Sequence, residues 1–402
     1  MTHDPPEEAR VRSRVQGLKE YRELYATSVE EPEAFWRRQA MMLAWFHQPA
    51  DMMESSAPGE FTWFSGGRLN ASVNCVDRHA ASHPDRAALV WAKNEPGEYE
   101  TWSFLDLKRR VGRIANVLKS LGVKRGDRVG VLRAQDPLCA AAHLAIWTLG
   151  AISLPLFKLF GPDALATRLG DSGGEHVLTD GEGAALLSAL PVTAHIPEHL
   201  DLHDNDLEPV DTGPEDPAIL IYTSGTTGAP KGALHGHRVL TGHLPGVEIS
   251  HDFLGQPGDV LWTPADWAWI GGLFDVLMPG LALGVPVVAA RLAKFTPEAA
   301  REVIREGGVR NVFFPPTALK MLKAADMALP GLRSVASGGE PLGAEMLDWG
   351  RRAFGLTINE FYGQTECNMI ASSAGSLFPA RPGCIGKPVP GHELAVLGPE
   401  GP

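Results

Sequence analysis

The chain has 402 residues, of which 44% are hydrophobic and 21% are charged, a composition typical of a globular protein with roughly two or three domain-sized units. Its formal net charge is −12 and its lysines and arginines form no continuous stripe, so neither nucleic acid nor an anionic membrane is an expected partner. The four cysteines show no CxxC spacing, which excludes a zinc ribbon or a redox pair and predicts reduced thiols in a cytoplasmic protein.

Two features bear on targeting and membrane insertion. Residues 1–20 are polar and mixed in charge, which is typical of a tail and not of a signal or transit peptide. The apolar stretch Leu138–Phe157 is long enough to span a bilayer, but it contains His143, Gly150 and Pro155 and becomes β-branched midway. We therefore predict a buried helix followed by a buried strand, and no membrane partner.

Strand-like and helix-like segments alternate along the chain. The expected strands are 127–134, 152–157, 176–180, 286–290, 311–316 and 332–342, and the expected helices are the region of Cys139, 162–173, 296–308 and 318–326. Continuous apolar strands between amphipathic helices predict an α/β fold with parallel sheets covered on both faces. The stretch rich in acid and proline, 203–217, is the expected linker between two such sheets.

The segment YTSGTTGAPKGALH, residues 222–235, follows an apolar strand and is rich in hydrogen-bond donors. Free backbone N–H groups, hydroxyls and the Lys231 ammonium suit a phosphate-binding loop. A Walker loop is excluded because Lys231 lies between Pro230 and Gly232, which do not suit a helix interior. A flexible surface hairpin would explain the glycines but not three threonines and a lone lysine.

The pair His235 and His237 follows this loop with the HxH spacing that places both rings on one side of a strand. Such a pair can bind a metal, but no third ligand lies nearby in the sequence. We do not expect a metal site there.

Three ordered motifs resemble the signatures of the adenylate-forming (AMP-binding) superfamily, and within it the acyl-CoA synthetases. They are TSGTTGAPKG, SGGEPL at Ser337–Leu342, and NEFYGQTE at Asn359–Glu366. The segment that begins at Tyr21 is similar to the N-terminus of acetyl-CoA synthetases. The resemblance implies a polar tail over 1–20, an acetyl-CoA-synthetase-type segment over 21–78, and an AMP-binding domain over 79–402. It also implies two doubly wound sheets with flanking helices and a small β-barrel-like subdomain.

The resemblance implies a role for each motif residue. Thr223, Lys231, Thr365 and Glu366 would be catalytic, with Glu366 binding Mg²⁺ and Tyr362 stacking on adenine. The residues expected to bind nucleotide are Ser224, Gly225, Thr226, Thr227, Gly228, Gly339, Glu340, Pro341, Glu360, Phe361, Tyr362, Gly363 and Gln364. Taken singly, Tyr362 would fit equally well as a core aromatic and Glu366 as a solvated carboxylate. Arg168 occupies a position that acetyl-CoA synthetases use near the CoA phosphates, although a surface helix arginine is the commoner explanation.

The acyl pocket implied by the resemblance is lined by Trp269, Ile270, Gly271, Gly338 and Gly363. Acetyl-CoA synthetases carry tryptophan at the position of Gly363 and valine at that of Gly338. Glycine at both positions predicts room for several further carbons, each CH₂ worth about 0.8 kcal/mol when buried. We therefore expect a medium-chain, branched or aromatic acid as substrate.

The function implied is ATP-dependent activation of a carboxylic acid to acyl-AMP, followed by transfer to coenzyme A. ATP, Mg²⁺, CoA and the acid would be its small-molecule partners. The alternatives are an acetate or propionate–CoA ligase, an enzyme that serves a carrier protein or oxidises the adenylate, and a nucleotide-binding fragment without catalysis. The family continues with a ribose-binding aspartate, a hinge and a lid domain with a catalytic lysine, which this sequence lacks. As a fragment or a shortened relative, the chain is expected to bind ATP but to form acyl-adenylate poorly.

Overall fold

The computed structural model describes residues 15, 17–57, 59–93, 97–200, 207–223 and 230–398. The chain divides into two compact units, and neither is continuous in sequence. Unit 1 comprises Met1–Met42, Thr241–Val260 and Lys294–Pro402, and unit 2 comprises Leu43–Leu240 and Leu261–Ala293. Each unit contains its own set of paired strands.

Unit 2 contains most of the strands and helices of the central part of the sequence. Its strands are β1 (Asp51–Ala57), β2 (Glu60–Ser65), β3 (Ala87–Ala92), β4 (Tyr99–Ser103), β5 (Arg128–Leu132), β6 (Ile152–Pro155), β7 (His176–Thr179), β8 (Thr193–His195), β9 (Pro217–Thr223), β10 (Lys231–Gly236), β11 (Leu261–Trp262) and β12 (Val287–Ala290). Its helices are η1 (Val73–Asp77), α4 (Arg78–Ser82), α5 (Phe104–Ser120), α6 (Pro137–Thr148), α7 (Pro162–Ser172), α8 (Gly181–Leu187), η2 (Pro197–His199), α10 (Ile270–Gly272), η3 (Leu273–Leu277) and α11 (Met278–Leu283).

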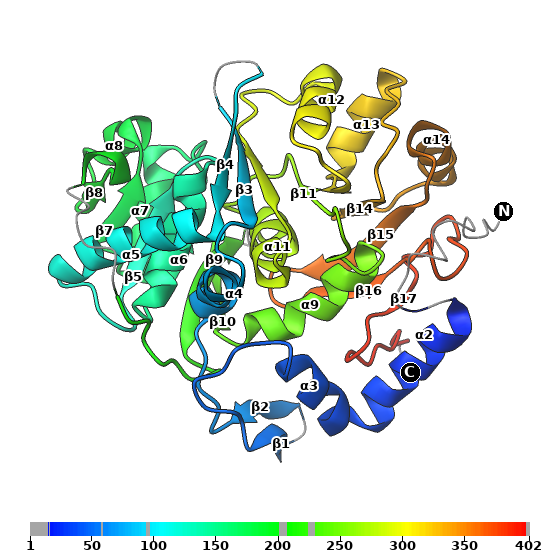
Figure 1. Cartoon of the computed structure of the whole chain (residues 1–402), viewed down its shortest axis with the longest axis horizontal. Coiled ribbons are helices and arrows are strands. Elements are labelled where there is room, and N and C mark those ends of the chain that lie inside the picture. Colours follow the sequence, from blue (N-terminus) through cyan, green and yellow to red (C-terminus); the bar gives the residue numbers. More distant parts are fainter. Residues whose placement is uncertain are drawn as a thin grey trace. The chain divides into compact units, whose positions relative to one another are not determined.

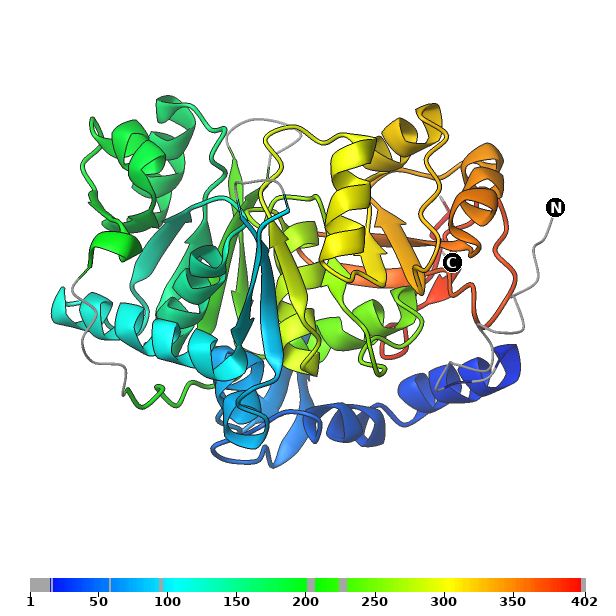
Figure 2. The same cartoon turned by 45° about the horizontal axis from the view of Figure 1, so that its top comes forward.

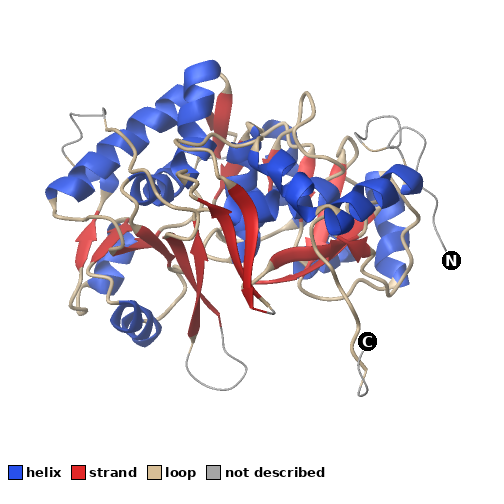
Figure 3. Ribbon diagram, turned by 90° about the horizontal axis from the view of Figure 1, so that it is seen from below, coloured by secondary structure: helices blue, strands red, loops and turns tan. Residues whose placement is uncertain are grey.

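The main sheet of unit 2 has six strands in the order β10-β9-β6-β5-β7-β8. The pairs from β9 to β8 are parallel, and β10 pairs antiparallel with β9 at one edge. Helices α5 and α6 lie against one face and α7 and α8 against the other, as Figure 1 and the row of red strands on the left of Figure 3 show. This arrangement confirms the predicted doubly wound parallel sheet. A second run of strands in unit 2, β11-β12-β3-β4, ends in the antiparallel pair β3–β4.

The apolar stretch Leu138–Phe157 forms most of helix α6 and strand β6, as predicted. Almost every side chain of α6 is buried, and Asp136 caps the helix by accepting a hydrogen bond from the backbone N–H of Cys139 at 2.6 Å. The His143 ring contacts the Ser153 hydroxyl of β6, so its polar atoms have a partner within the core. No helix in the described ranges is long and apolar enough to cross a membrane.

The prediction that 203–217 links two sheets is wrong. Both of its neighbours in sequence, β8 and β9, belong to the same six-stranded sheet of unit 2. Its described part is held in place: the Val210 N–H donates to the Thr148 carbonyl at 2.9 Å, and Thr212 is fully buried beside Leu69. The prediction rested on acid and proline content, which is a local property. The contacts that hold the segment are made by residues far away in sequence.

Unit 1 combines the N-terminal helices with the C-terminal part of the sequence. Its helices are α2 (Leu18–Glu30), α3 (Pro32–Ala40), α9 (Val239–Ser250, in unit 1 from Thr241), α12 (Pro297–Glu306), α13 (Pro316–Ala324) and α14 (Ala344–Phe354). Its strands are β13 (Asn311–Phe313), β14 (Ser334–Gly338), β15 (Ile358–Gln364), β16 (Asn368–Ser372) and β17 (Lys387–Pro388). In Figures 1 and 2 the yellow to orange helices α12, α13 and α14 lie on one side of β13 to β15.

The strands of unit 1 are paired in the order β17-β16-β15-β14-β13. The β13–β14 and β14–β15 pairs are parallel, which confirms the predicted βα units, while β16 and β17 add antiparallel strands. These antiparallel strands continue the sheet of β15, and the separate barrel-like subdomain stays a prediction. The parallel strands place the ends of β14 and β15 side by side, and two of the three motifs follow there.

Candidate functional site

The SGGEPL and NEFYGQTE motifs meet in unit 1 at the carboxyl ends of two adjacent strands. In the parallel pair β14–β15, Ser337 is opposite Glu360 and Gly338 is opposite Phe361. The carboxyl edge of a parallel sheet is where α/β proteins bind ligands. The structure therefore brings together the motif residues Gly338 to Pro341 and Glu360 to Glu366.

Glu360 ties these two motifs to each other. Its side chain is buried, and burial raises the pKa of the carboxyl group, while a backbone hydrogen bond from Leu342 opposes that shift. Gly339 has a φ of 101°, a conformation that favours glycine and lets the chain turn sharply after β14. Glu340, in contrast, is exposed and forms an ion pair with Lys320 at 2.8 Å. Glu360 thus positions the turn, and Glu340 stands at its surface.

The turn between β15 and β16 carries the exposed part of the motif. Tyr362 is 41% exposed, so the alternative that it is a core aromatic is wrong and its ring is accessible for stacking. Gln364 and Glu366 are exposed and Thr365 is half-buried. No cluster of three or more potential metal-ligating side chains lies in the described ranges of the chain. A single accessible carboxylate such as Glu366 does fit Mg²⁺, which typically takes one or two carboxylates together with phosphate oxygens and water.

The two glycines expected to open the acyl pocket do not leave open space. A β-carbon on Gly338 would lie 2.4 Å from the ring of Phe361, and one on Gly363 would lie 2.0 Å from the carbonyl oxygen of Asn368. Phe361 is 7% exposed and its ring packs against Phe313 at a centroid distance of 5.4 Å. Position 363 is thus glycine because β16 approaches closely. The lack of side chains at Gly338 and Gly363 therefore does not support a larger acid.

The loop predicted to bind phosphate connects the antiparallel strands β9 and β10 of unit 2. Thr223 at the end of β9 pairs with Lys231 at the start of β10, and the Thr223 hydroxyl donates to the Lys231 carbonyl at 3.4 Å. Lys231 is exposed and begins a strand instead of a helix, as the exclusion of a Walker loop requires. The other loop candidates, Ser224, Gly225, Thr226, Thr227 and Gly228, lie outside the described residues.

Arg168 supports the base of this loop. Its guanidinium lies 4.0 Å from the ring centroid of Phe160 and 5.9 Å from that of Tyr222, the residue before Thr223. The arginine is 6% exposed, so the alternative of a surface arginine is wrong. The Tyr222 hydroxyl donates to the carboxylate of Asp171, which belongs to the same helix, α7. Sequence reasoning missed Phe160, Tyr222 and Asp171, since nothing in their spacing shows that they converge.

The expected pocket residues Trp269, Ile270 and Gly271 stand at the start of α10 in unit 2. The Trp269 ring lies 5.5 Å from Phe157 and 5.9 Å from Phe160 between centroids. Trp269 is 36% exposed, so part of the indole remains accessible. Phe160 therefore contacts both the indole and Arg168, a link between the pocket candidate and the base of the phosphate loop.

His237 is a structural residue of unit 2. Its ring is fully buried, and its Nδ1 accepts a hydrogen bond from the Ala71 backbone N–H at 3.2 Å. Burial lowers the pKa of this histidine to about 3, so the ring is neutral at physiological pH. That the HxH pair holds no metal stays a prediction.

Two family models together match residues 21–402 of this chain. The AMP-binding enzyme family matches residues 76–402, and the acetyl-coenzyme A synthetase N-terminus family matches residues 21–75. Acetyl-coenzyme A synthetase 2 of Candida glabrata is 31% identical over 96% of this chain and 63% of its own length. Acetyl-coenzyme A synthetase of Penicillium chrysogenum is also 31% identical, over 96% of this chain and 64% of its own length. The chain thus spans less than two thirds of the length of these curated relatives.

Two solved structures have the same fold. The acyl-CoA synthetase of Brucella canis has a TM-score of 0.79 and 26% identity, and the match covers 100% of this chain and 69% of that one. The acetoacetyl-CoA synthetase of Streptomyces lividans has a TM-score of 0.84 over 99% of this chain and 70% of its own, and at 22% identity it shows the fold alone. With the motifs in place and the family match over most of its length, the chain belongs to the AMP-binding enzyme family.

Proposed function

We propose that this chain is the ATP-binding part of an AMP-forming acid–CoA ligase whose acid is short, namely acetate or propionate. The observation that carries the proposal is the meeting of SGGEPL and NEFYGQTE at the ends of β14 and β15, with an accessible Tyr362 and Glu366. The same strands support a short acid, because Phe361 and the Asn368 backbone occupy the space beside Gly338 and Gly363.

In the first step, an oxygen of the acid attacks the α-phosphorus of ATP, and the bond to the β-phosphate oxygen breaks to release pyrophosphate. A carboxylate is already a nucleophile at neutral pH, so the site must neutralise charge and align the reactants. Lys231, Thr223 and the hydroxyls and N–H groups of Ser224 to Gly228 would hold the leaving phosphates. Thr365 would contact the α-phosphate, and Tyr362 and the turn from Gly339 to Pro341 would hold the adenine.

Mg²⁺ would be held by Glu366 and ATP phosphate oxygens, where it would supply positive charge for the developing pyrophosphate. In the second step, the CoA thiol would lose its proton to solvent and attack the acyl carbonyl carbon, and AMP would leave. The acetyl-CoA-synthetase-type segment over residues 21–75 supports CoA, and not a carrier protein, as the acceptor.

The function is tested by measuring AMP and pyrophosphate release with ATP, Mg²⁺, CoA and a panel of acids from acetate through octanoate to benzoate. We expect acetate or propionate to give the highest kcat/KM, and AMP release to depend on CoA. If octanoate or benzoate is clearly the best substrate, the prediction of a larger acyl pocket is supported and the short-acid proposal is wrong. AMP release that needs no CoA would favour a carrier-protein or other acceptor, and no acid-dependent release would favour a binding fragment without catalysis.

A further inference from the structure

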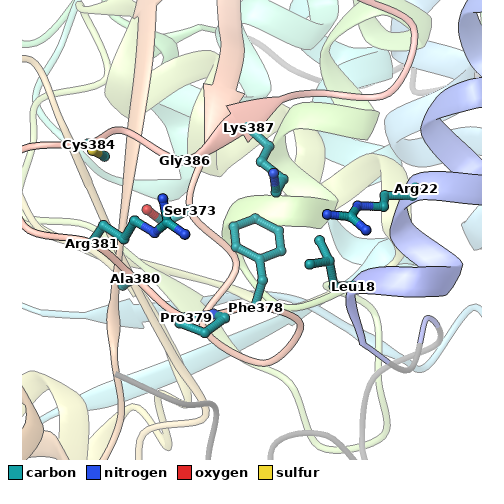
Figure 4. Close-up of a pocket in the computed structure, with 10 residues that line it drawn as sticks. All are labelled: Leu18, Arg22, Ser373, Phe378, Pro379, Ala380, Arg381, Cys384, Gly386 and Lys387. Carbon is teal, nitrogen blue, oxygen red and sulfur yellow. The ribbon is translucent and has the colours of Figure 1, made fainter. Parts of the chain in front are cut away.

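A cavity in unit 1 lies where helix α2 meets the segment from Ser373 to Lys387, which ends at the first residue of strand β17 (Figure 4). Its volume is about 220 Å³. A water molecule takes up about 30 Å³ of liquid, so the cavity has room for several waters or one small ligand. None of the nucleotide or acid candidates described above lines it.

The cavity is lined by basic and no acidic side chains, although the chain as a whole is acidic. Arg22, Arg381 and Lys387 line it, and the ten lining residues include no aspartate or glutamate. In Figure 4 the end groups of Arg22 and Lys387 approach the Phe378 ring on one side and that of Arg381 on the other. Three cations thus gather at one site in a chain whose net charge is −12.

Arg22 and Arg381 are exposed and Lys387 is half-buried, so solvent reaches all three, whereas two enclosed arginines of the chain have carboxylate partners. Arg133 pairs with Asp136 and Glu198, and Arg333 pairs with Asp259 at 2.7 Å. Among the described residues, no carboxylate forms an ion pair with Arg22, Arg381 or Lys387; Lys387 instead lies 5.7 Å from the Phe378 ring centroid. Cations held together without a counter-charge repel one another, and a bound anion would remove that repulsion.

The elements that carry the cations are fixed in position. Phe378 is 5% exposed and packs edge-on against Tyr21, the neighbour of Arg22, and the Tyr21 hydroxyl donates to the Pro388 carbonyl beside Lys387. Between Arg381 and Lys387, the Ser373 hydroxyl donates to the Ile385 carbonyl at 2.9 Å. Gly386 has a φ of 124° and touches the Ser372 backbone so closely that a side chain would not fit. The cavity is therefore formed before any ligand binds.

We propose that this cavity is a binding site for a small anion that carries a phosphate or pyrophosphate group. Arg and Lys are the side chains that pair with phosphate oxygens, and three cations match an anion with two or more negative charges better than a single carboxylate. A volume of about 220 Å³ suits a compact phosphate compound. This site does not depend on the function proposed above.

The reporter for the test is Cys384, an exposed free thiol that lines the cavity. Cys367, also an exposed free thiol, follows Glu366 and reports on the proposed ATP site in the same sample. The alkylation rate of each thiol by iodoacetamide is measured by mass spectrometry on the whole chain at constant ionic strength. The added anions are inorganic phosphate, pyrophosphate and, as a monoanion control, acetate.

We expect pyrophosphate or phosphate to slow alkylation of Cys384 at least fivefold with saturation, while acetate at equal ionic strength does not. Arg381→Gln combined with Lys387→Gln should abolish this protection. Arg352→Gln, an exposed arginine of α14 outside the cavity, and Lys231→Ala, in the phosphate loop, should leave it unchanged. Protection by acetate, protection that survives in the double variant, or no protection by either phosphate anion would overturn the proposal.

Discussion

The Phe361 ring decides whether Gly338 leaves room for a larger acid. A glycine in place of a larger residue predicts a larger pocket only if the vacated volume stays empty. Here the ring of Phe361, on the adjacent strand β15, occupies it, and a β-carbon at 338 would lie 2.4 Å from that ring. The sequence contains both residues, but only the register of β14 against β15 shows that they share one space.

Gly338→Val is therefore expected to destabilise the protein by about 1–3 kcal/mol, the usual cost of overpacking a core. The free energy of unfolding in urea measures this, and Phe361→Ala in the same chain should reduce the cost of the valine by making room for it. Gly343→Ala is the matched control, because no atom lies within 4 Å of a β-carbon at that position. If Gly338→Val lowers the free energy of unfolding no more than Gly343→Ala does, the space beside Gly338 is open. The prediction of a larger acid as substrate would then be supported.

His237 should make the stability of unit 2 depend on pH. Its pKa falls from 6.5 to about 3 on folding, mainly because the ring is buried, while Asp216 opposes and Arg125 adds to the shift. A lowered pKa means that the unfolded chain takes up the proton more readily. The stabilisation is therefore complete above about pH 6.5 and is lost as pH falls toward 3.

His237→Asn should keep an acceptor for the Ala71 N–H and remove the titration. Between pH 7 and pH 4 the wild type should lose more unfolding free energy than the variant, by over about 1 kcal/mol, since one pKa unit corresponds to about 1.4 kcal/mol. Urea unfolding at a series of pH values checks this. Equal slopes for the two proteins would mean that the ring is not held neutral by burial.

At the scale of elements, helix α7 and strand β9 are joined through the rings around Arg168. The guanidinium lies against Phe160, which follows β6, and near Tyr222 of β9, while Asp171 of α7 accepts the Tyr222 hydroxyl. This contact holds the strand that leads into the phosphate loop. A lysine has no planar group to stack on Phe160, so it is not an equivalent replacement.

A double-mutant cycle with Arg168→Lys and Phe160→Leu should give a coupling energy of about 0.5–2 kcal/mol in unfolding free energy, the range for a cation on an aromatic face. Arg128→Lys with Phe160→Leu is a control, because Arg128 bonds the carbonyls of Ser172 and Gly173 at the other end of α7. Additive effects in the Arg168 cycle would show that the stacking contributes nothing to stability.

The same scale separates what local sequence patterns predict from what they miss. Alternating apolar strands and amphipathic helices predicted the βα units correctly, from β5 to β7 and from β12 to β14, because each element buries one face with its own period. The prediction that the segment 203–217 is a linker is wrong, because its hydrogen bond to Thr148 and its burial beside Leu69 depend on distant residues. Local composition carries no record of such contacts.

At the scale of the whole chain, the two compact units interrupt each other in sequence. The N-terminal helices join the C-terminal strands in unit 1, where Tyr21 packs on Phe378 and the Ser28 hydroxyl accepts a hydrogen bond from the Gly391 N–H at 2.8 Å. No periodicity predicts a pairing across this sequence separation. The motifs were readable because their residue types follow from phosphate chemistry, whereas the basic cavity beside α2 arises only when the chain folds.

The pairing of Tyr21 with the C-terminal segment has a testable consequence for unit 1. Tyr21→Phe keeps the ring but leaves the half-buried Pro388 carbonyl without this donor, and it should cost about 1–2 kcal/mol of unfolding free energy. Tyr25→Phe, one turn along the same helix and half-buried, is the control. Thermal or urea unfolding checks both. A Tyr21→Phe variant as stable as the wild type would mean that this bond does not hold α2 in place.

The most direct test of the central claim is calorimetric titration of the 402-residue chain with stable acyl-AMP analogues that carry acetyl, propionyl, octanoyl or benzoyl groups. An ATP-dependent ligase for a short acid predicts saturable binding of the acetyl or propionyl analogue, weakened at least tenfold by Thr365→Ala at the α-phosphate, and binding of the octanoyl analogue at least tenfold weaker. If the octanoyl analogue binds about a hundredfold tighter, the gain expected when four of its six additional carbons are buried, the short-acid account is contradicted. If no analogue binds, the ligase account itself is contradicted.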